Sequence, residues 1–201
     1  MLRSFLVALL ILMPLVLLPP TVRAEQGPMA EIQLGADIGS PFPWPTGSVL
    51  LGWRLSDRWS AGVSYTPWRI VFQEMRQGND YGASPIMLSG LHAVGDFWYK
   101  TGSAWGGKAG IHLGALTPYL GVAEPGDDMS GAVAEGLLSA AWGYMGTFLS
   151  CQAFAKAGWK WGRLENNTHE RSMVGDGPVI VDRVDVSDPT FMTGLALAVW
   201  F

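Results

Sequence analysis

The sequence predicts an all-β protein: an eight-stranded antiparallel up-and-down transmembrane β-barrel, preceded by a cleavable leader. Three observations predict this fold. Most of the chain alternates apolar and polar residues with a period of two, which is typical of strands. The connections between these segments alternate between short and long. The apolar faces carry bulky side chains, whereas the opposite faces carry Gly, Ser and scattered charges.

The composition excludes several classes of protein. Only 15% of the 201 residues are charged and 11% are aromatic, whereas a disordered chain has high charge and few aromatic residues. Thirteen Lys and Arg stand against 17 Asp and Glu. No nucleic acid partner is expected, because nucleic-acid binders carry a basic patch or stripe. The single cysteine, Cys151, cannot form an internal disulfide.

Residues 1–24 have the pattern of a secretory signal peptide. A basic start at Arg3 is followed by a nearly unbroken apolar run over 5–18 and by a small residue, Ala24, before the expected cleavage point. The alternative is a retained membrane anchor, but prolines interrupt the run, which falls short of the roughly 20 residues that a helix needs to span a bilayer. We therefore expect export through the periplasm and a barrel domain over 25–201.

Eight later segments show the alternation of a strand. In 107–116, for example, Ile111 and Leu113 lie on one face, and Lys108 and His112 lie on the other. None of these segments approaches 18 consecutive apolar residues, so we expect no later membrane-spanning helix. The predicted strands are 31–39, 48–55, 59–68, 89–100, 107–116, 132–145, 148–163 and 191–201.

The predicted connections alternate in length. Short turns at one rim and longer loops at the other are typical of outer-membrane barrels. An up-and-down meander of this kind needs no crossover helix. The short turns are predicted at 56–58, 101–103 and 145–147, and the longer loops at 40–47, 69–86, 117–131 and 164–190.

The bulky apolar face is expected to contact lipid. A closed eight-stranded barrel has room inside only for side chains, and faces of Gly, Ser and a few charges suit that interior. The alternative is a soluble periplasmic barrel or sandwich that binds an apolar ligand and packs its aromatic residues in a core. Two aromatic girdles favour the membrane: Trp53, Trp59, Tyr99, Trp142 and Tyr144 near the short turns, and Tyr65, Trp68, Trp159 and Trp161 toward the long loops.

Charged residues on the inward faces are expected to pair, because an isolated charge in a narrow interior of low dielectric is costly. The predicted network is close to neutral and plugs the lumen. An alternative function for its two histidines is a path for protons or ions. The predicted members are Asp37, Arg54, Asp96, Lys108, Glu135, Lys156, Lys160, His92 and His112.

The short turns also suggest a register for the network. A hairpin centred on Gly102 would place Asp96 opposite Lys108 and His92 opposite His112. Around the turn at 146–147, Glu135 would lie diagonally between Lys156 and Lys160.

The leader, the eight strands, the loop pattern and the ending over 194–201 resemble the small OmpA/OmpX-type outer-membrane barrels of Gram-negative bacteria. The resemblance covers essentially all of the chain after the leader, but its motifs are short. It implies that Phe201, at the end of an alternating strand, is the signal read by the barrel assembly machinery. It also implies a monomer in contact with outer-membrane lipid and lipopolysaccharide.

Enzymatic and metal-binding chemistry is only weakly indicated. A lipid A deacylase, the alternative function on this fold, would need a His and a Ser close together on the lipid-facing rim with an acidic partner. The nearest pattern is the loop segment 168–172, whose spacing is not that of the deacylases. The acidic clusters 124–128 and 182–188 do not have the spacing of a calcium loop. We expect no cofactor and no metal site.

The acidic loop 164–190 is the most distinctive segment expected outside the membrane. Its apolar stretch 178–181 could extend the last two strands as a hairpin and offer an edge to a partner. The sequence does not identify that partner.

Overall fold

The computed structural model of the 201-residue chain describes residues 26–39, 43–77, 80–101, 104–118, 129–166, 172–174, 177–179 and 183–201. Within these ranges, no helix is long and apolar enough to cross a membrane.

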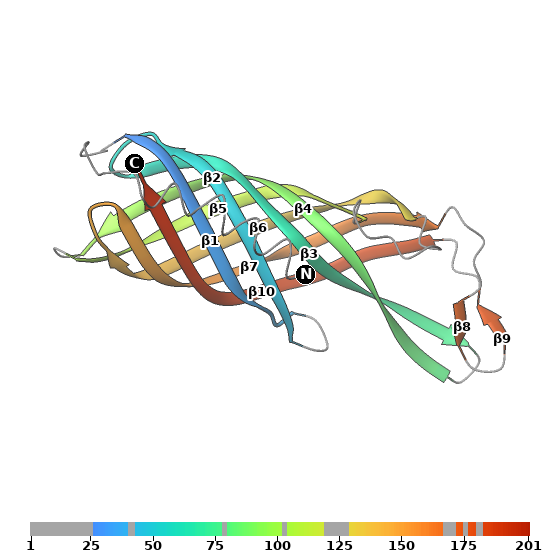
Figure 1. The fold of residues 1–201 in the computed structure, drawn as a ribbon. Coiled ribbons are helices and arrows are strands. Elements are labelled where there is room, and N and C mark those ends of the chain that lie inside the picture. Colours follow the sequence, from blue (N-terminus) through green and yellow to red (C-terminus); the bar gives the residue numbers. More distant parts are fainter. Residues whose placement is uncertain are drawn as a thin grey trace.

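Eight long strands close into an antiparallel barrel, so the predicted eight-stranded barrel is confirmed; the predicted leader, 1–24, lies outside the described residues. Each strand pairs with its neighbour along the chain, and β1 closes the barrel against β10 (Figure 1). A separate two-stranded sheet lies at the end of the barrel opposite the C-terminus. The barrel strands are β1 (Gly27–Asp37), β2 (Trp44–Arg54), β3 (Trp59–Gln77), β4 (Asp80–Lys100), β5 (Trp105–Pro118), β6 (Met129–Met145), β7 (Leu149–Asn166) and β10 (Arg183–Trp200), and the small sheet holds β8 (Ser172–Val174) and β9 (Gly177–Val179).

The outward face of the barrel is apolar, as the alternation predicts. Leu113, Leu138 and Leu195 each expose 60% or more of their surface, and Cys151 is exposed on the same side of the wall. The inward face buries the polar residues instead. A soluble barrel around an apolar ligand does not fit this distribution, because it would bury the large aliphatic side chains.

Aromatic side chains gather on the outward face at two levels. Trp53, Trp59 and Trp142 are exposed close to the short turns, whereas Trp159 and Trp161 are exposed toward the other end. Such rings prefer the boundary between lipid and water. Their two levels therefore mark the limits of the lipid-contacting band.

The predicted register of two hairpins is wrong by two residues. Asp96 pairs with Gly110 and not with Lys108, and His92 pairs with Gly114 and not with His112. The cause is the turn: the ladder ends at Lys100 and Gly106, and the amide of Thr101 donates to the carbonyl of Trp105 at 3.0 Å, so the connection is longer than three residues.

The second hairpin shows the same displacement, because its turn is centred one residue later than predicted. Glu135 lies directly opposite Lys160, and Ser139 lies opposite Lys156. A slip of one residue would turn every side chain to the other face. A slip of two residues leaves each side chain on its predicted face.

The predicted loop 69–86 is also wrong, because β3 and β4 continue as a paired ladder to Gln77 and Asp80. The register shifts between Thr66 and Arg69, so Pro67 and Trp68 stand together opposite one residue of β4. This β-bulge interrupts the alternation, which is why the period of two was lost at that point.

The region 164–190 contains more strand than predicted. The last barrel strand begins at Arg183 and not at 191, and it pairs with β7 up to Glu165. The extension of these two strands therefore uses Arg183–Thr190. Of the expected stretch 178–181, Pro178 and Val179 pair with Met173 and Ser172 in the separate sheet, and residues 180–181 lie outside the described residues.

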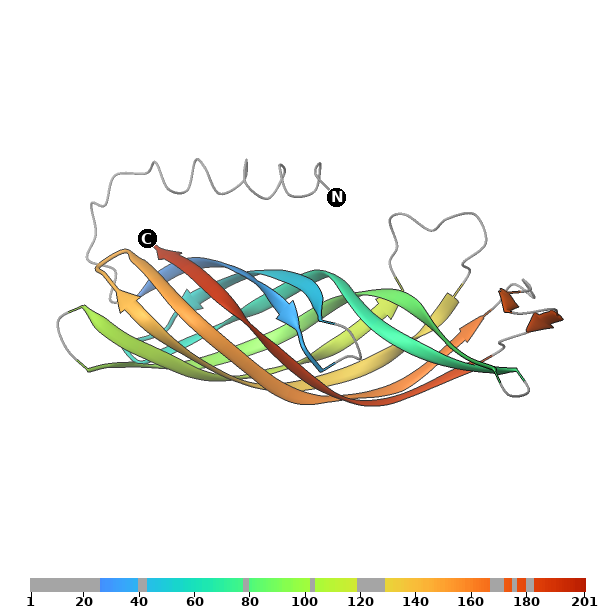
Figure 2. The ribbon, with the colours of Figure 1, turned by 90° about the horizontal axis from the view of Figure 1, so that it is seen from below.

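The β1–β2 hairpin is shorter than its neighbours, which leaves part of the wall without a ladder. Its register ends at Asp37 and Trp44, and β2 pairs with β3 only between the Val49–Tyr65 and Arg54–Ser60 pairs. Beyond the end of the hairpin at Asp37 and Trp44, β3 and β10 continue without it between them (Figures 1 and 2). We call the place where β2 and β3 separate the seam.

Leu138→Arg is expected to destabilise the folded barrel by about 2–4 kcal/mol, because its side chain lies in the middle of the apolar outward face. The measurement is equilibrium unfolding in lipid vesicles. Leu55→Arg is the matched control, since Leu55 is equally outward but adjoins a short turn. It should cost only about 0–1 kcal/mol. Equal losses at the two positions would contradict the assignment of the lipid-facing band.

Candidate functional site

The barrel interior is filled in three layers. An aromatic layer lies near the short turns, a network of charged and polar side chains occupies the middle, and an aliphatic layer lies toward the far end. Every described charged residue of the predicted network is placed in this interior with a relative exposure of 8% or less. The interior is therefore the candidate site.

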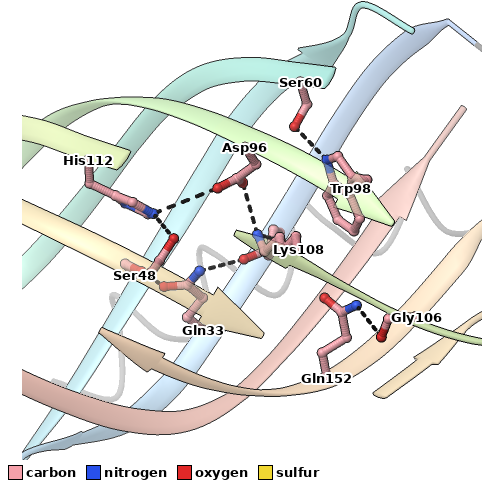
Figure 3. A network of polar contacts seen from close by, with 11 residues as sticks. Gln33, Ser48, Ser60, Asp96, Trp98, Gly106, Lys108, His112 and Gln152 are labelled. Carbon is pink, nitrogen blue, oxygen red and sulfur yellow. Dashed lines mark hydrogen bonds and ion pairs between the residues drawn. The ribbon is translucent and has the colours of Figure 1, made fainter. Parts of the chain in front are cut away.

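Two tryptophans close the end near the short turns. The rings of Trp98 and Trp200 meet edge to face with centroids 5.8 Å apart. Trp98 Nε1 donates to Ser60 Oγ at 2.7 Å (Figure 3). The Arg54 guanidinium lies over both rings, at 5.8 and 5.2 Å from their centroids, and donates to the carbonyl of Asp57. This cation contacts aromatic faces where the prediction expected carboxylates.

Lys108 is the centre of the first charged cluster. Its ammonium lies 2.5 Å from Glu31 Oε2 and 3.1 Å from Asp96 Oδ2. Glu31 also accepts from Gln33, which in turn accepts from the Ser48 hydroxyl at 3.0 Å. Figure 3 shows the side chains of Gln33, Asp96 and Lys108 converging in the lumen. One buried cation thus joins carboxylates from β1 and β4.

Arg69 is the centre of the second charged cluster. Its guanidinium donates to Asp37 Oδ2 at 2.7 Å and to Glu135 Oε1. Glu135 also lies 2.9 Å from His92 Nε2 and accepts from Thr190 Oγ1 at 3.2 Å. This cluster joins strands on opposite sides of the lumen, because Asp37 is on β1, Arg69 on β3 and Glu135 on β6.

Lys156 and Lys160 complete the balance of charge. Within the described residues neither makes a direct ion pair, but Lys156 interacts electrostatically with Glu31 and Asp96, and Lys160 with Asp37 and Glu135. Lys108 and Arg69 each face two carboxylates, so each cluster would carry one excess negative charge without its second lysine. Buried charge is tolerated only when it is compensated in this way.

The sequence analysis did not include Glu31 and Arg69 in the interior network. Their relative exposures are 1% and 3%, respectively. Glu31 shares the face of Gln33 and Asp37 by the period of two, so its position could have been predicted. Arg69 could not be placed by alternation. In β3, the even-numbered residues face the lumen before the bulge, whereas the odd-numbered Arg69 and Val71 face it after the bulge.

Glycine shapes the lumen beside Asp96. Gly110 lies directly opposite Asp96, and a Cβ at that position would collide with Asp96 Oδ1. The missing side chain therefore leaves the space that the carboxylate occupies.

The third layer is aliphatic and closes the end away from the short turns. Its members come from six strands and are each no more than 7% exposed, and they pack against one another in a single cluster. They are Val71, Leu88, Leu116, Val133, Leu164, Val184 and Val186.

Two small pockets adjoin the polar layer. The inner one lies in the lumen, with about 10 Å³ available to the centre of a water molecule, and is lined by Ser64, His92 and Lys156 among others. The outer one is lined by Asp37, Trp44 and Trp68, and both pockets include Thr46 and Arg69.

The two histidines that the structure describes, His92 and His112, do not form a hydrolytic triad. His112 Nε2 lies 3.2 Å from Ser139 Oγ and 4.0 Å from Asp96 Oδ1. A triad needs the acid and the serine on different ring nitrogens, whereas here both face Nε2. His112 is also buried in the lumen and does not face lipid.

The other candidate sites lie mainly in the loops. The segment 124–128 and most of 168–172 lie outside the described residues. In the acidic segment 182–188, Asp185 accepts from Arg163 at 3.0 Å in an exposed ion pair. The described ranges contain no group of three His, Cys, Asp or Glu side chains that could hold a metal ion.

Comparison with known proteins supports the fold. No protein-family model and no curated protein matches the sequence. Among solved structures, the chain is similar to the crystal structure of the outer membrane protein OprG from Pseudomonas aeruginosa, with 12% sequence identity and a TM-score of 0.53. The match covers 90% of this chain and 100% of that one.

Arg69→Met is expected to destabilise the barrel by about 3–5 kcal/mol, because it leaves two buried carboxylates without their cation. Equilibrium unfolding in detergent or lipid checks the value. Arg163→Met is the control, since it removes the same charge from an exposed pair and should cost at most about 1 kcal/mol. Similar losses for both variants would show that the interior pairing does not stabilise the fold.

Proposed function

We propose that this chain, which has the fold of an eight-stranded outer-membrane barrel, serves as a structural or surface-interaction protein whose lumen is sealed and whose acidic loops contact other components of the cell surface. The observation that carries the proposal is the filled interior. Two apolar layers enclose a compensated polar layer, and narrow barrels are commonly filled in this way.

Each layer supports a seal along the axis of the barrel. Trp98 and Trp200 are no more than 4% exposed, and Leu88, Leu116 and Val133 are fully buried. The small inner pocket in the charged layer between them, with room for about one water molecule, supports the same seal. The interior histidines are held by Glu135, Ser139 and Asp96, which favours a structural role over a path for ions.

The length of the strands supports loops that lie away from the membrane. Unpaired backbone groups are too costly to expose to hydrocarbon, so the part of the wall beyond the Val49–Tyr65 pair belongs outside the lipid core. The extended β3–β4 and β7–β10 ladders then project from the surface and carry the acidic loop residues with them. The chemistry of the loops suits a partner that presents cations or hydrogen-bond donors.

We further propose that Phe201 acts in assembly. It follows the last strand, and its amide donates to the carbonyl of Pro28 at 3.1 Å where β10 meets β1. An aromatic residue thus follows β10 at the place where the first and last strands of the barrel meet. The assembly machinery would engage the chain there. Outer-membrane lipid and lipopolysaccharide are the proposed surroundings of a monomer.

The purified protein is expected to show no stable conductance in planar bilayers, because the aromatic and aliphatic layers block the axis. The recording requires that the sample migrates as a folded, heat-modifiable barrel, with protein-free bilayers as the baseline. A reproducible open state in the folded protein would contradict the sealed lumen.

Phe201→Ala is expected to reduce the amount of folded barrel in the outer membrane while its backbone hydrogen bond to Pro28 is kept. Heat-modifiable migration of membrane fractions measures the folded amount. Phe148→Ala is the control, since Phe148 is 54% exposed beside a short turn. If both variants assemble as well as the parent protein, Phe201 is not an assembly signal.

A further inference from the structure

The inner pocket contains hydroxyl groups that have no use in the sealed barrel. Thr46 lies on β2, and Ser64 and Thr66 lie on β3, and all three line the pocket at 8% exposure or less. Within the described part of the chain their hydroxyls make no hydrogen bond to protein atoms, and they are open to the pocket that they line. Lys156 lines the same pocket. These groups can form hydrogen bonds with water or with a small polar solute in the pocket.

The wall beside this pocket is the seam. The β2–β3 ladder ends at Val49 and Tyr65, whereas Thr46 and Thr66 lie just beyond it. Pro67, in the bulge, has no amide hydrogen to extend a ladder. Separating β2 from β3 at this level therefore breaks no backbone hydrogen bond between them.

The outer pocket lies on the other side of the same seam. It shares Thr46 and Arg69 with the inner pocket, so the Arg69 side chain stands between the two spaces. Trp68 covers the seam from outside: a Cβ at Gly47 would lie 3.7 Å from Trp68 Cζ2, and Gly47 is buried although Pro45, on the same face of β2, is exposed. Arg69 Nε has no hydrogen-bond partner within the described residues.

We propose that the seam is a side portal through which water and small polar solutes reach the luminal pocket, with Arg69 as its inner gate and Trp68 as its outer cover. The pocket as it stands holds about one water molecule. A larger solute enters when Arg69 leaves Asp37 or Glu135. The hydroxyls of Ser64 and Thr66, with Lys156, then supply its hydrogen bonds.

The portal lies near the outer limit of the lipid band, since Tyr65 belongs to the second aromatic girdle. It goes beyond the proposed function, which concerns only closure along the axis. A portal that opens sideways into a pocket leaves both the aromatic and the aliphatic layers in place.

The test uses a single thiol in the pocket of the full-length folded protein. In a Cys151→Ser background, Ser64→Cys is treated with a small, charged, membrane-impermeant methanethiosulfonate, and the rate of modification is measured with and without Arg69→Ala. Removing Arg69 is expected to raise the rate by about tenfold or more, because losing a buried ion pair shifts a two-state gate at least that far.

The matched control is Ser60→Cys in the same background. Ser60 also faces the lumen but lies against Trp98 in the aromatic layer, so its thiol should stay unreactive in both forms. An unchanged rate at Ser64→Cys, or an equal rise at Ser60→Cys, would overturn the portal. The second result would mean general loosening of the barrel.

Trp68→Ala provides a second variant that leaves both ion pairs of Arg69 intact. It uncovers the seam and should also accelerate modification at Ser64→Cys but not at Ser60→Cys. If Arg69→Ala does not fold, this variant decides the question, and an unchanged rate would overturn the portal. A conducting parent protein would overturn the axial seal alone, so the two proposals fail separately.

Discussion

The compensation of buried charge inside a narrow closed barrel is the constraint on which the rest of the structure depends. Backbone ladders join only neighbouring strands, but the ion pairs cross the lumen. Arg69 joins β3 to β1 and β6, and Lys108 joins β5 to β1 and β4. Removing one partner would leave a charge in a region of low dielectric. The strands are therefore held at one relative placement by the interior as well as by the wall.

One irregularity completes this network and also weakens the wall. The bulge at Pro67 and Trp68 shifts the phase of β3, which turns Arg69 into the lumen. The same residues stand where β3 parts from β2, so the cation that joins the two sides of the lumen lies beside a stretch where β2 and β3 are not paired. A bulge that re-aims a side chain in this way is a common device beside functional sites.

Much of the fold could be predicted because lipid and a filled lumen impose opposite chemistries on alternate residues. The eight strands, the apolar outward face and the exposed aromatic residues all follow from the period of two. The register of the hairpins could not be predicted to better than two residues, since a two-residue slip keeps every side chain on the same face. The lengths of β3 and β10 were underestimated for two reasons. The bulge breaks the period of two in β3. In the outer part of β10 the alternation continues with Val184 and Val186 inside and the polar Asp185 outside.

The sequence by itself determined which residues face lipid and which face the lumen, because that division depends only on local alternation. It therefore placed Asp96, Lys108 and Glu135 inside. Only the tertiary structure decided which of these charges meet. Glu135 binds Arg69 from β3 and His92 from β4, and Lys108 binds Glu31 from β1, since curvature of the closed wall brings together strands that are far apart in the chain. The alternation of residues along a strand does not encode contacts across the lumen. A single bulge also changes which residues of a strand face inward.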